Sequence, residues 1–311
     1  MKRVLVLGAG TGGTIVANML TRELDLREWE VAVVDSAEEH HYQPGNLFIP
    51  FRLYGYEGRE DVARPIRKPL SSKVRFVKGA VRAIDTEARR VECDGERLDY
   101  DFLVTALGCR LAPEEVEGLG PALGEGAIHT FYDLDHALAM QEPLARMESG
   151  RLVVDIADTP IKCPPAPIEF AFLADSFFRK KGVRDRIQIT LVTPYAGAFT
   201  KPNTNRVLSQ VAQEKGIEVV PNFLLASVDP EGRTIRSYGG EEVPFDLLCI
   251  VPPNLGPDVI EESGLGDGAG YCLTDPRTLR HRKAERVYVI GDVANIPTSK
   301  AGSVAHFEAE T

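Results

Sequence analysis

Residues 3–36 have the sequence RVLVLGAGTGGTIVANMLTRELDLREWEVAVVDS, and this stretch decides the fold. A short apolar run is followed by a glycine-rich turn, by a segment with apolar residues at helical spacing, and by a second apolar run that ends at Asp35. The order strand, turn, helix, strand over about 30 residues predicts a βαβ unit that opens a parallel sheet.

The turn of this unit, Gly8-Ala9-Gly10-Thr11-Gly12-Gly13, matches the GxGxxG pattern of dinucleotide-binding proteins. Gly8 permits a tight turn, Gly10 lets the backbone approach a pyrophosphate, and Gly13 lets the helix pack against the strand. The N–H groups at the helix N-terminus favour a phosphate. Asp35 is placed to accept hydrogen bonds from a ribose diol. Because strand, helix and acid are all in register, we predict dinucleotide binding and not an ordinary glycine turn.

The rest of the chain continues to alternate between strands and helices. Residues 74–100 have the alternation of antiparallel strands with a hairpin turn at Asp94-Gly95, and residues 101–108 return to a buried strand. From about residue 113 a second α/β pattern begins, and its helices end at Gly182 and Gly216. We therefore predict an α/β protein with two Rossmann-like domains, the second inserted into the first: residues 1–112, then 113–253, then a return to the first domain at 254–311.

Composition excludes several classes of function. A chain of 311 residues exceeds what one hydrophobic core usually holds, which favours two domains. The net charge of −10 has the wrong sign for electrostatic binding of nucleic acid. No apolar run approaches the roughly 18–20 residues that cross a bilayer, and no signal peptide is evident. The five cysteines include no CxxC pair, which argues against a zinc site and against a secreted disulfide framework.

A second signal, Gly291-Asp292, ends a strand some 280 residues after the glycine turn. An Asp at this point can reach a ribityl hydroxyl, although Gly-Asp pairs also occur in ordinary strand-ending turns. Its position favours FAD over NAD, because in flavoproteins with two dinucleotide domains a late strand ending in GD closes the FAD domain. Residues 101–113, DFLVTALGCRLAP, resemble the ATG segment of those proteins, with Leu107 in place of its threonine.

From residue 1 to its end, the chain resembles sulfide:quinone oxidoreductases and the flavin subunits of flavocytochrome c sulfide dehydrogenases, within the glutathione-reductase-like superfamily. Three segments carry the resemblance: HYQPG (41–45), CPPAPIE (163–169) and GDVANIPTSKAG (291–302). It implies bound FAD, with a lysine and a helix N-terminus near the flavin ring. Together with the glycine turn and its acid, it suggests these FAD-binding residues: Gly8, Gly10, Thr11, Gly12, Gly13, Asp35, Ser36, Gln43, Val81, Ala106, Gly108, Gly291, Asp292, Lys300 and Gly302.

The second domain lacks a glycine fingerprint. After its first strand the chain has DTPIKCPPAPIEF (158–170), which is too bulky and too rich in proline for a backbone to approach a pyrophosphate. Reduction of the flavin by NAD(P)H is therefore disfavoured. A cysteine, Cys163, stands where the glycines would be.

Cys163 precedes a helix predicted for residues 166–181, whose N-terminus, with Lys162, favours a thiolate. The alternative is a small buried core residue, which we prefer for Cys93, Cys109, Cys249 and Cys272. The resemblance instead implies that Cys163 is a redox nucleophile. Glu169, one helical turn further on, is either a proton relay or a partner of the helix dipole.

The resemblance implies oxidation of sulfide to polysulfide or sulfur, with electrons passing through FAD to a quinone. Alternatives are the flavin subunit of a cytochrome-linked sulfide dehydrogenase and a flavin-binding relic without turnover. The resemblance also implies a second redox cysteine and a membrane-binding tail after Thr311, so we expect the chain to be truncated. We expect the protein to be cytoplasmic or peripherally associated with a membrane. The sequence leaves open whether it forms a homo-oligomer. Tyr132 stands where some relatives have an additional cysteine, and Ala198 where some have a histidine.

Overall fold

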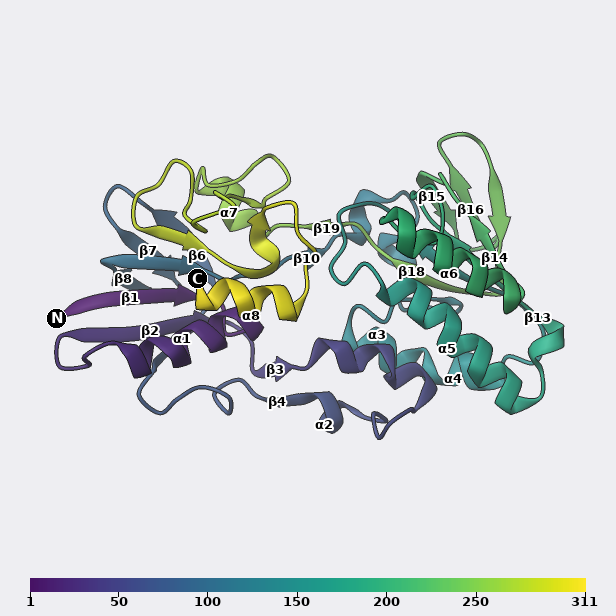
Figure 1. Ribbon diagram of the computed structural model, residues 1–311, viewed down its shortest axis with the longest axis horizontal. Helices are drawn as coiled ribbons and strands as arrows, with labels where there is room; N and C mark the ends of the chain where they lie inside the picture. The colour runs from purple at the N-terminus through teal and green to yellow at the C-terminus, as the bar shows by residue number, and fades with distance from the viewer. The chain divides into compact units, whose positions relative to one another are not determined.

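The computed structural model describes residues 1–311, which divide into two α/β units (Figure 1). Unit 1 comprises residues 1–41, 63–110 and 255–311, and unit 2 comprises 42–62 and 111–254. The sequence prediction assigned residues 42–62 to the first domain, but they cluster with unit 2. The reason is aromatic packing within unit 2, because the buried ring of Phe51 lies 4.8 Å from the ring of Phe170. None of the helices is both long enough and apolar enough to span a membrane.

The sheet of unit 1 has five parallel strands in the order β21-β9-β1-β2-β5. The strands are β1 (Lys2–Leu7), β2 (Trp29–Asp35), β5 (Arg75–Lys78), β9 (Phe102–Thr105) and β21 (Val287–Val289). The prediction of antiparallel strands for residues 74–100 is wrong for β5. This strand pairs in parallel with β2 at one edge of the sheet. The prediction is confirmed for β6 (Val81–Asp85), β7 (Arg90–Cys93) and β8 (Glu96–Asp99), with Gly95 in the turn at φ +81°.

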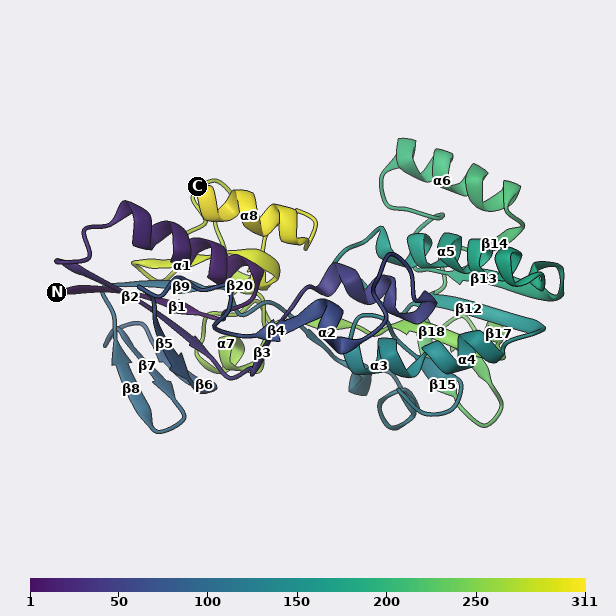
Figure 2. The ribbon, with the colours of Figure 1, turned by 90° about the horizontal axis from the view of Figure 1, so that it is seen from below.

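The two faces of this sheet are covered by different layers. Val4 and Val6 face one layer, where α1 (Thr11–Glu23) and α8 (Gly302–Glu310) lie side by side (Figures 1 and 2). Leu5 and Leu7 alternate with them and face the core beneath β6–β8 and α7 (Asp258–Glu262). The strict alternation of β1 thus buries both of its faces, which explains its continuously apolar sequence.

Unit 2 repeats this architecture around a parallel sheet of order β11-β18-β12-β13-β14. The helices α5 (Ala166–Lys181) and α6 (Pro202–Glu214) lie on one face, as Figure 2 shows. An antiparallel meander packs its apolar residues against the other face. The strands are β11 (Ile128–His129), β12 (Gly150–Ile156), β13 (Ile187–Val192), β14 (Ile217–Val220), β18 (Leu247–Val251) and, in the meander, β15 (Leu225–Asp229), β16 (Thr234–Ser237) and β17 (Glu242–Pro244).

Short elements complete the two units. They are β3 (Glu39–His41), α2 (Arg59–Val62), β4 (Ala63–Pro65), β10 (Arg110–Leu111), α3 (Leu134–Ala139), α4 (Gln141–Arg146), β19 (Asn254–Leu255), β20 (Cys272–Leu273) and β22 (Ala294–Asn295). The helix predicted to end at Gly182 does so, with that glycine in the left-handed conformation at φ +78°.

Candidate functional site

The glycine turn of unit 1 connects β1 to α1 with very little space around two of its glycines. Gly8 has φ +96°, and a Cβ there would lie 2.5 Å from the carbonyl oxygen of Ala106. A Cβ at Gly13 would lie 1.8 Å from the carbonyl oxygen of Gly8. A Cβ at Gly10, in contrast, would meet nothing within 4 Å. The turn therefore packs tightly against the rest of the protein at Gly8 and Gly13 and leaves free space at Gly10. This free space fits the pyrophosphate of a dinucleotide.

Asp35 holds this turn from the end of β2. One carboxylate oxygen accepts the Ala9 N–H at 2.6 Å, and the other accepts the Ala37 N–H at 2.7 Å. His40 approaches the same residue from β3, with its Nδ1 2.9 Å from the Ala9 carbonyl oxygen. Ser36 follows Asp35 and is exposed. Sequence reasoning missed His40, because its contact depends on how β3 returns toward the turn.

The carboxyl ends of neighbouring strands bring further predicted residues to this turn. Ala106 follows β9 and contacts Gly8, and Gly291 follows β21 with φ +74°. A Cβ at Gly302 would lie 3.7 Å from Cγ2 of Thr11, so α1 and α8 begin beside each other. Two helix N-termini then converge near one edge of the sheet, an arrangement that favours phosphate.

A carboxylate that the sequence did not predict anchors the Gly291-Asp292 turn. Glu308 of α8 accepts the Gly291 N–H at 2.6 Å, and burial raises the pKa of this glutamate. Lys300 donates to the carbonyl oxygens of Asp292 at 2.7 Å and Ala294 at 3.1 Å. Burial lowers the pKa of Lys300, whose ammonium lies 4.0 Å from the centre of the Tyr271 ring.

Two other predicted residues of unit 1 are Val81 and Gly108. Val81 opens β6 and packs against the buried core of the sheet, and Gly108 has φ +71° with open space where a Cβ would lie. Gln43, the remaining predicted FAD residue, belongs to unit 2.

In unit 2, the Cys163 turn leads from β12 to α5. Cys163 is exposed and has a left-handed backbone with φ +48°. Its carbonyl oxygen accepts the Ala166 N–H at 3.0 Å and the hydroxyl of Tyr132 at 3.0 Å. The turn therefore presents a thiol to solvent at the start of a 16-residue helix.

Polar contacts hold Lys162, the residue before Cys163. The Lys162 N–H donates to Oδ1 of Asn254 at 3.0 Å, and the Lys162 ammonium donates to Oε1 of Gln43 at 3.0 Å. Glu169 lies in the first turn of α5, and burial raises the pKa of its carboxyl group. A raised carboxyl pKa suits exchange of a proton near neutral pH.

Three other cysteines are buried in the core. Burial raises the pKa of Cys93, raises that of Cys272 to about 12, and raises that of Cys249 well above its ordinary value. These thiols stay protonated and fit the structural role expected for them. Cys109 is half-buried and close enough to Lys300 for electrostatic interaction.

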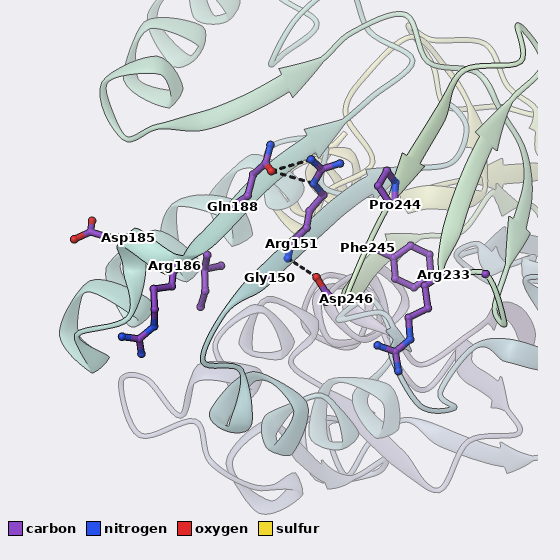
Figure 3. Close-up of a pocket in the computed structure, with 11 residues that line it drawn as sticks. Gly150, Arg151, Asp185, Arg186, Gln188, Arg233, Pro244, Phe245 and Asp246 are labelled. Atoms are coloured by element: carbon purple, nitrogen blue, oxygen red, sulfur yellow. Dashed lines mark hydrogen bonds between the residues drawn. The ribbon is translucent and has the colours of Figure 1, made fainter.

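A groove of about 680 Å³ lies at the opposite edge of the unit 2 sheet, where β12 and β13 begin (Figure 3). Figure 3 shows its Arg151 donating to Gln188, while Asp246 accepts the backbone N–H of Arg151. None of the predicted site residues lines it. The candidate chemistry therefore lies at the carboxyl edges of the sheets and not in this groove.

Comparison with known proteins agrees with this geometry. Residues 2–154 match the family described as pyridine nucleotide-disulphide oxidoreductase. The chain is also 29% identical over 310 residues to the mitochondrial sulfide:quinone oxidoreductase of Mus musculus, covering 96% of this chain and 67% of the relative. The first half of the chain thus matches this family, and the chain as a whole resembles sulfide:quinone oxidoreductases.

A second relative and a solved structure match nearly the whole chain. The sulfide-quinone reductase of Aquifex aeolicus is 25% identical over 309 residues, covering 95% of this chain and 69% of the relative. A crystal structure of the sulfide:quinone oxidoreductase from that bacterium superposes with a TM-score of 0.81 at 21% identity, covering 100% of this chain and 76% of the other. The predicted family, the two Rossmann-like domains and the cofactor FAD are confirmed.

Proposed function

We propose that this protein oxidises sulfide with FAD as cofactor and a quinone as electron acceptor, and that Cys163 is the redox thiol. The observation that carries the proposal is the exposed Cys163, held in a left-handed turn where the second Rossmann-like unit would otherwise have a glycine fingerprint. The similarity to sulfide:quinone oxidoreductases over 96% of the chain supports the choice of substrates.

The proposed step at Cys163 joins two sulfur atoms. The Cys163 thiolate and HS⁻ form a persulfide anion, and this bond releases one proton and two electrons. FAD, when bound, would supply the two-electron acceptor, and a quinone would take up these two electrons and two protons to become a quinol. Glu169 is the proposed acceptor of the released proton, because burial raises the pKa of its carboxyl group.

The residues of unit 1 hold and orient the cofactor in this proposal. Gly8, Gly10 and Gly13 would form the turn that binds the pyrophosphate, Asp35, which holds this turn, would bind the ribose, and Asp292 would bind the ribityl chain. Lys300 holds the segment after Gly291 through two backbone carbonyls. The remaining predicted FAD residues stay part of this proposal.

Anaerobic titration with sulfide tests the proposed function. We expect sulfide to bleach the flavin absorption band of the FAD-loaded protein, and Cys163→Ser to slow bleaching at least a hundredfold. Cys109→Ser is the matched control and should bleach as the wild type does. Bleaching that persists in Cys163→Ser, or an unchanged wild-type spectrum, contradicts the proposal.

The acceptor is tested by reoxidation. We expect a soluble quinone to restore the flavin band rapidly, whereas reoxidation by cytochrome c and not by quinone would instead favour a cytochrome-linked sulfide dehydrogenase. Because quinones partition into lipid, we also propose a peripheral encounter with a membrane surface. Sedimentation with quinone-containing liposomes checks this encounter.

A further inference from the structure

Tyr132 lies beneath the Cys163 turn and contacts it through its hydroxyl group. The side chain is buried, at 7% exposure, and its hydroxyl donates to the Cys163 carbonyl oxygen at 3.0 Å. The Ala166 N–H donates to the same oxygen. One carbonyl is thus held from two directions, from the core by a phenol and from the helix by a backbone amide.

This restraint acts at a backbone conformation that residues with a Cβ seldom adopt. Cys163 has φ +48°, in the left-handed region, and such conformations persist only where the surroundings hold them. Lys162, the preceding residue, is bonded through its backbone N–H to Asn254 and through its ammonium to Gln43. The ammonium also lies 6.0 Å from the centre of the Tyr132 ring. The turn is therefore fixed on both sides of the thiol.

The phenol keeps its donor proton under all working conditions. Burial raises the pKa of Tyr132 well above its ordinary value, and the nearby Cys163, Tyr195 and Cys249 act in the same direction, as does Glu169. The hydrogen bond to the Cys163 carbonyl therefore persists across the pH range in which a thiolate forms. The ring also packs 4.9 Å from the ring of Phe131, a contact that phenylalanine at position 132 would retain.

From these contacts we infer that Tyr132 is a positioning residue: its hydroxyl sets the direction in which the Cys163 thiol projects from the turn. The inference rests on the proposed function only in giving that thiol a chemical role. Tyr132 does not itself exchange a proton in the reaction, because its hydroxyl is committed to a backbone carbonyl.

Tyr132→Phe tests this inference, since it removes the hydroxyl and keeps the ring. Alkylation of Cys163 by iodoacetamide is measured by mass spectrometry on the full FAD-loaded chain between pH 5 and pH 10. We expect the midpoint of the pH profile to move upward by about half a pH unit or more, because a looser turn no longer holds the thiol at the start of α5. We also expect about fivefold slower limiting flavin bleaching at an unchanged half-saturating sulfide concentration, as the loss of one net hydrogen bond implies.

Tyr195→Phe is the matched control, because Tyr195 is a half-buried tyrosine of the same unit whose backbone carbonyl, not its hydroxyl, accepts the Asn222 N–H. It should leave the alkylation profile unchanged. A Tyr132→Phe profile equal to the wild type overturns the inference. If Tyr132→Phe does not fold, Tyr132→Met and Tyr132→Gln are compared, since the two side chains are similar in size and only glutamine offers a hydrogen-bond donor. A profile shifted in Tyr132→Met alone supports positioning, and equal profiles refute it.

The two proposals fail in different ways. If sulfide still bleaches the flavin of Cys163→Ser, the proposed function is refuted. The alkylation profile of Tyr132→Phe then still reports whether the phenol orients the thiol. If Cys163→Ser is inactive and Tyr132→Phe matches the wild type in both measurements, only the positioning role falls.

Discussion

The turn after β1 in unit 1 and the turn after β12 in unit 2 occupy equivalent places in two similar sheets, but they have opposite chemistry. The first has glycines that no side chain could replace at Gly8 and Gly13, with open space at Gly10. The second contains Pro164 and Pro165, which lack N–H groups, after an exposed cysteine. The comparison shows that the same Rossmann-like frame can carry either an open glycine turn or a proline-rich turn with an exposed cysteine.

The acidic residues of the two sheets differ in the same way. Asp35 accepts the N–H of Ala9 in the glycine turn and the N–H of Ala37. Asp155, near the end of β12, is fully buried, and neither of its carboxyl oxygens has a hydrogen-bond partner. It pairs in the sheet with the apolar residues Val192 and Ile250. Asp35 thus supports the glycine turn from the neighbouring strand β2, whereas Asp155 lies on β12, the equivalent of β1, and supports no turn.

The largest effect is expected from a substitution that places a side chain inside the glycine turn of unit 1. In Gly13→Val the side chain would collide with the Gly8 carbonyl, because even a Cβ would lie 1.8 Å from that oxygen. We expect the purified protein to contain almost no FAD and to unfold at a lower temperature. The ratio of flavin to protein absorbance and a thermal melt measure both effects.

Gly10→Ala tests FAD binding separately from the stability of the fold. A Cβ at Gly10 meets nothing within 4 Å, so the fold should keep its stability while FAD binds about tenfold more weakly or worse. Unchanged affinity for FAD in this variant would contradict the assignment of Gly10 to the pyrophosphate.

The sequence of the turn in unit 2 predicts that sulfide reduces the flavin much faster than NADH or NADPH does. Because this turn offers no glycine fingerprint to a nicotinamide dinucleotide, we expect NADH and NADPH to bleach the flavin at least a hundredfold more slowly than sulfide does. Stopped-flow traces at equal reductant concentration provide the measurement. Comparable rates would show that unit 2 still binds a nucleotide in spite of its prolines.

The smallest effect concerns Asp155 and depends on pH. Burial raises the pKa of Asp155 well above its ordinary value, so the unfolded chain ionises this group at lower pH than the folded protein does. The free energy of unfolding therefore falls as pH rises above about 4. Asp155→Asn removes this dependence, and we expect it to increase the free energy of unfolding at pH 8 by about 1 kcal/mol, with a smaller gain at pH 5. Urea unfolding at both pH values measures the difference.

Asp175 is the control for this prediction, because it is equally buried but contacts Arg179, Arg184 and Lys215. Burial acts to raise the pKa of Asp175, but hydrogen bonds from these three cations outweigh it, and the net shift is downward. Asp175→Asn should lower the free energy of unfolding at pH 7 by about 3 kcal/mol. An equal loss of stability in Asp155→Asn at every pH would show that its carboxyl has a partner in solution.

The parts of the fold and site that were predicted from sequence depend on local signals. The glycine turn, the hairpin at Gly95 and the helix end at Gly182 are each determined by a few neighbouring residues. The direction of β5 was not predictable, because alternation along a strand is the same in parallel and antiparallel pairs. The contacts of His40 and Glu308 were missed because each comes from an element whose position depends on tertiary packing. Residues 42–62 were misassigned because the partner of Phe51 is Phe170, more than a hundred residues away.

The division of the chain has a consequence for its synthesis. Unit 2 is complete once residue 254 has been made, whereas the sheet of unit 1 gains its last strand only at Val287–Val289. While residues 111–254 are translated, which takes on the order of ten seconds, β9 has one edge without its final neighbour. We therefore expect the nascent chain to depend most on chaperones in this interval, when an open strand edge is available for mispairing with other chains.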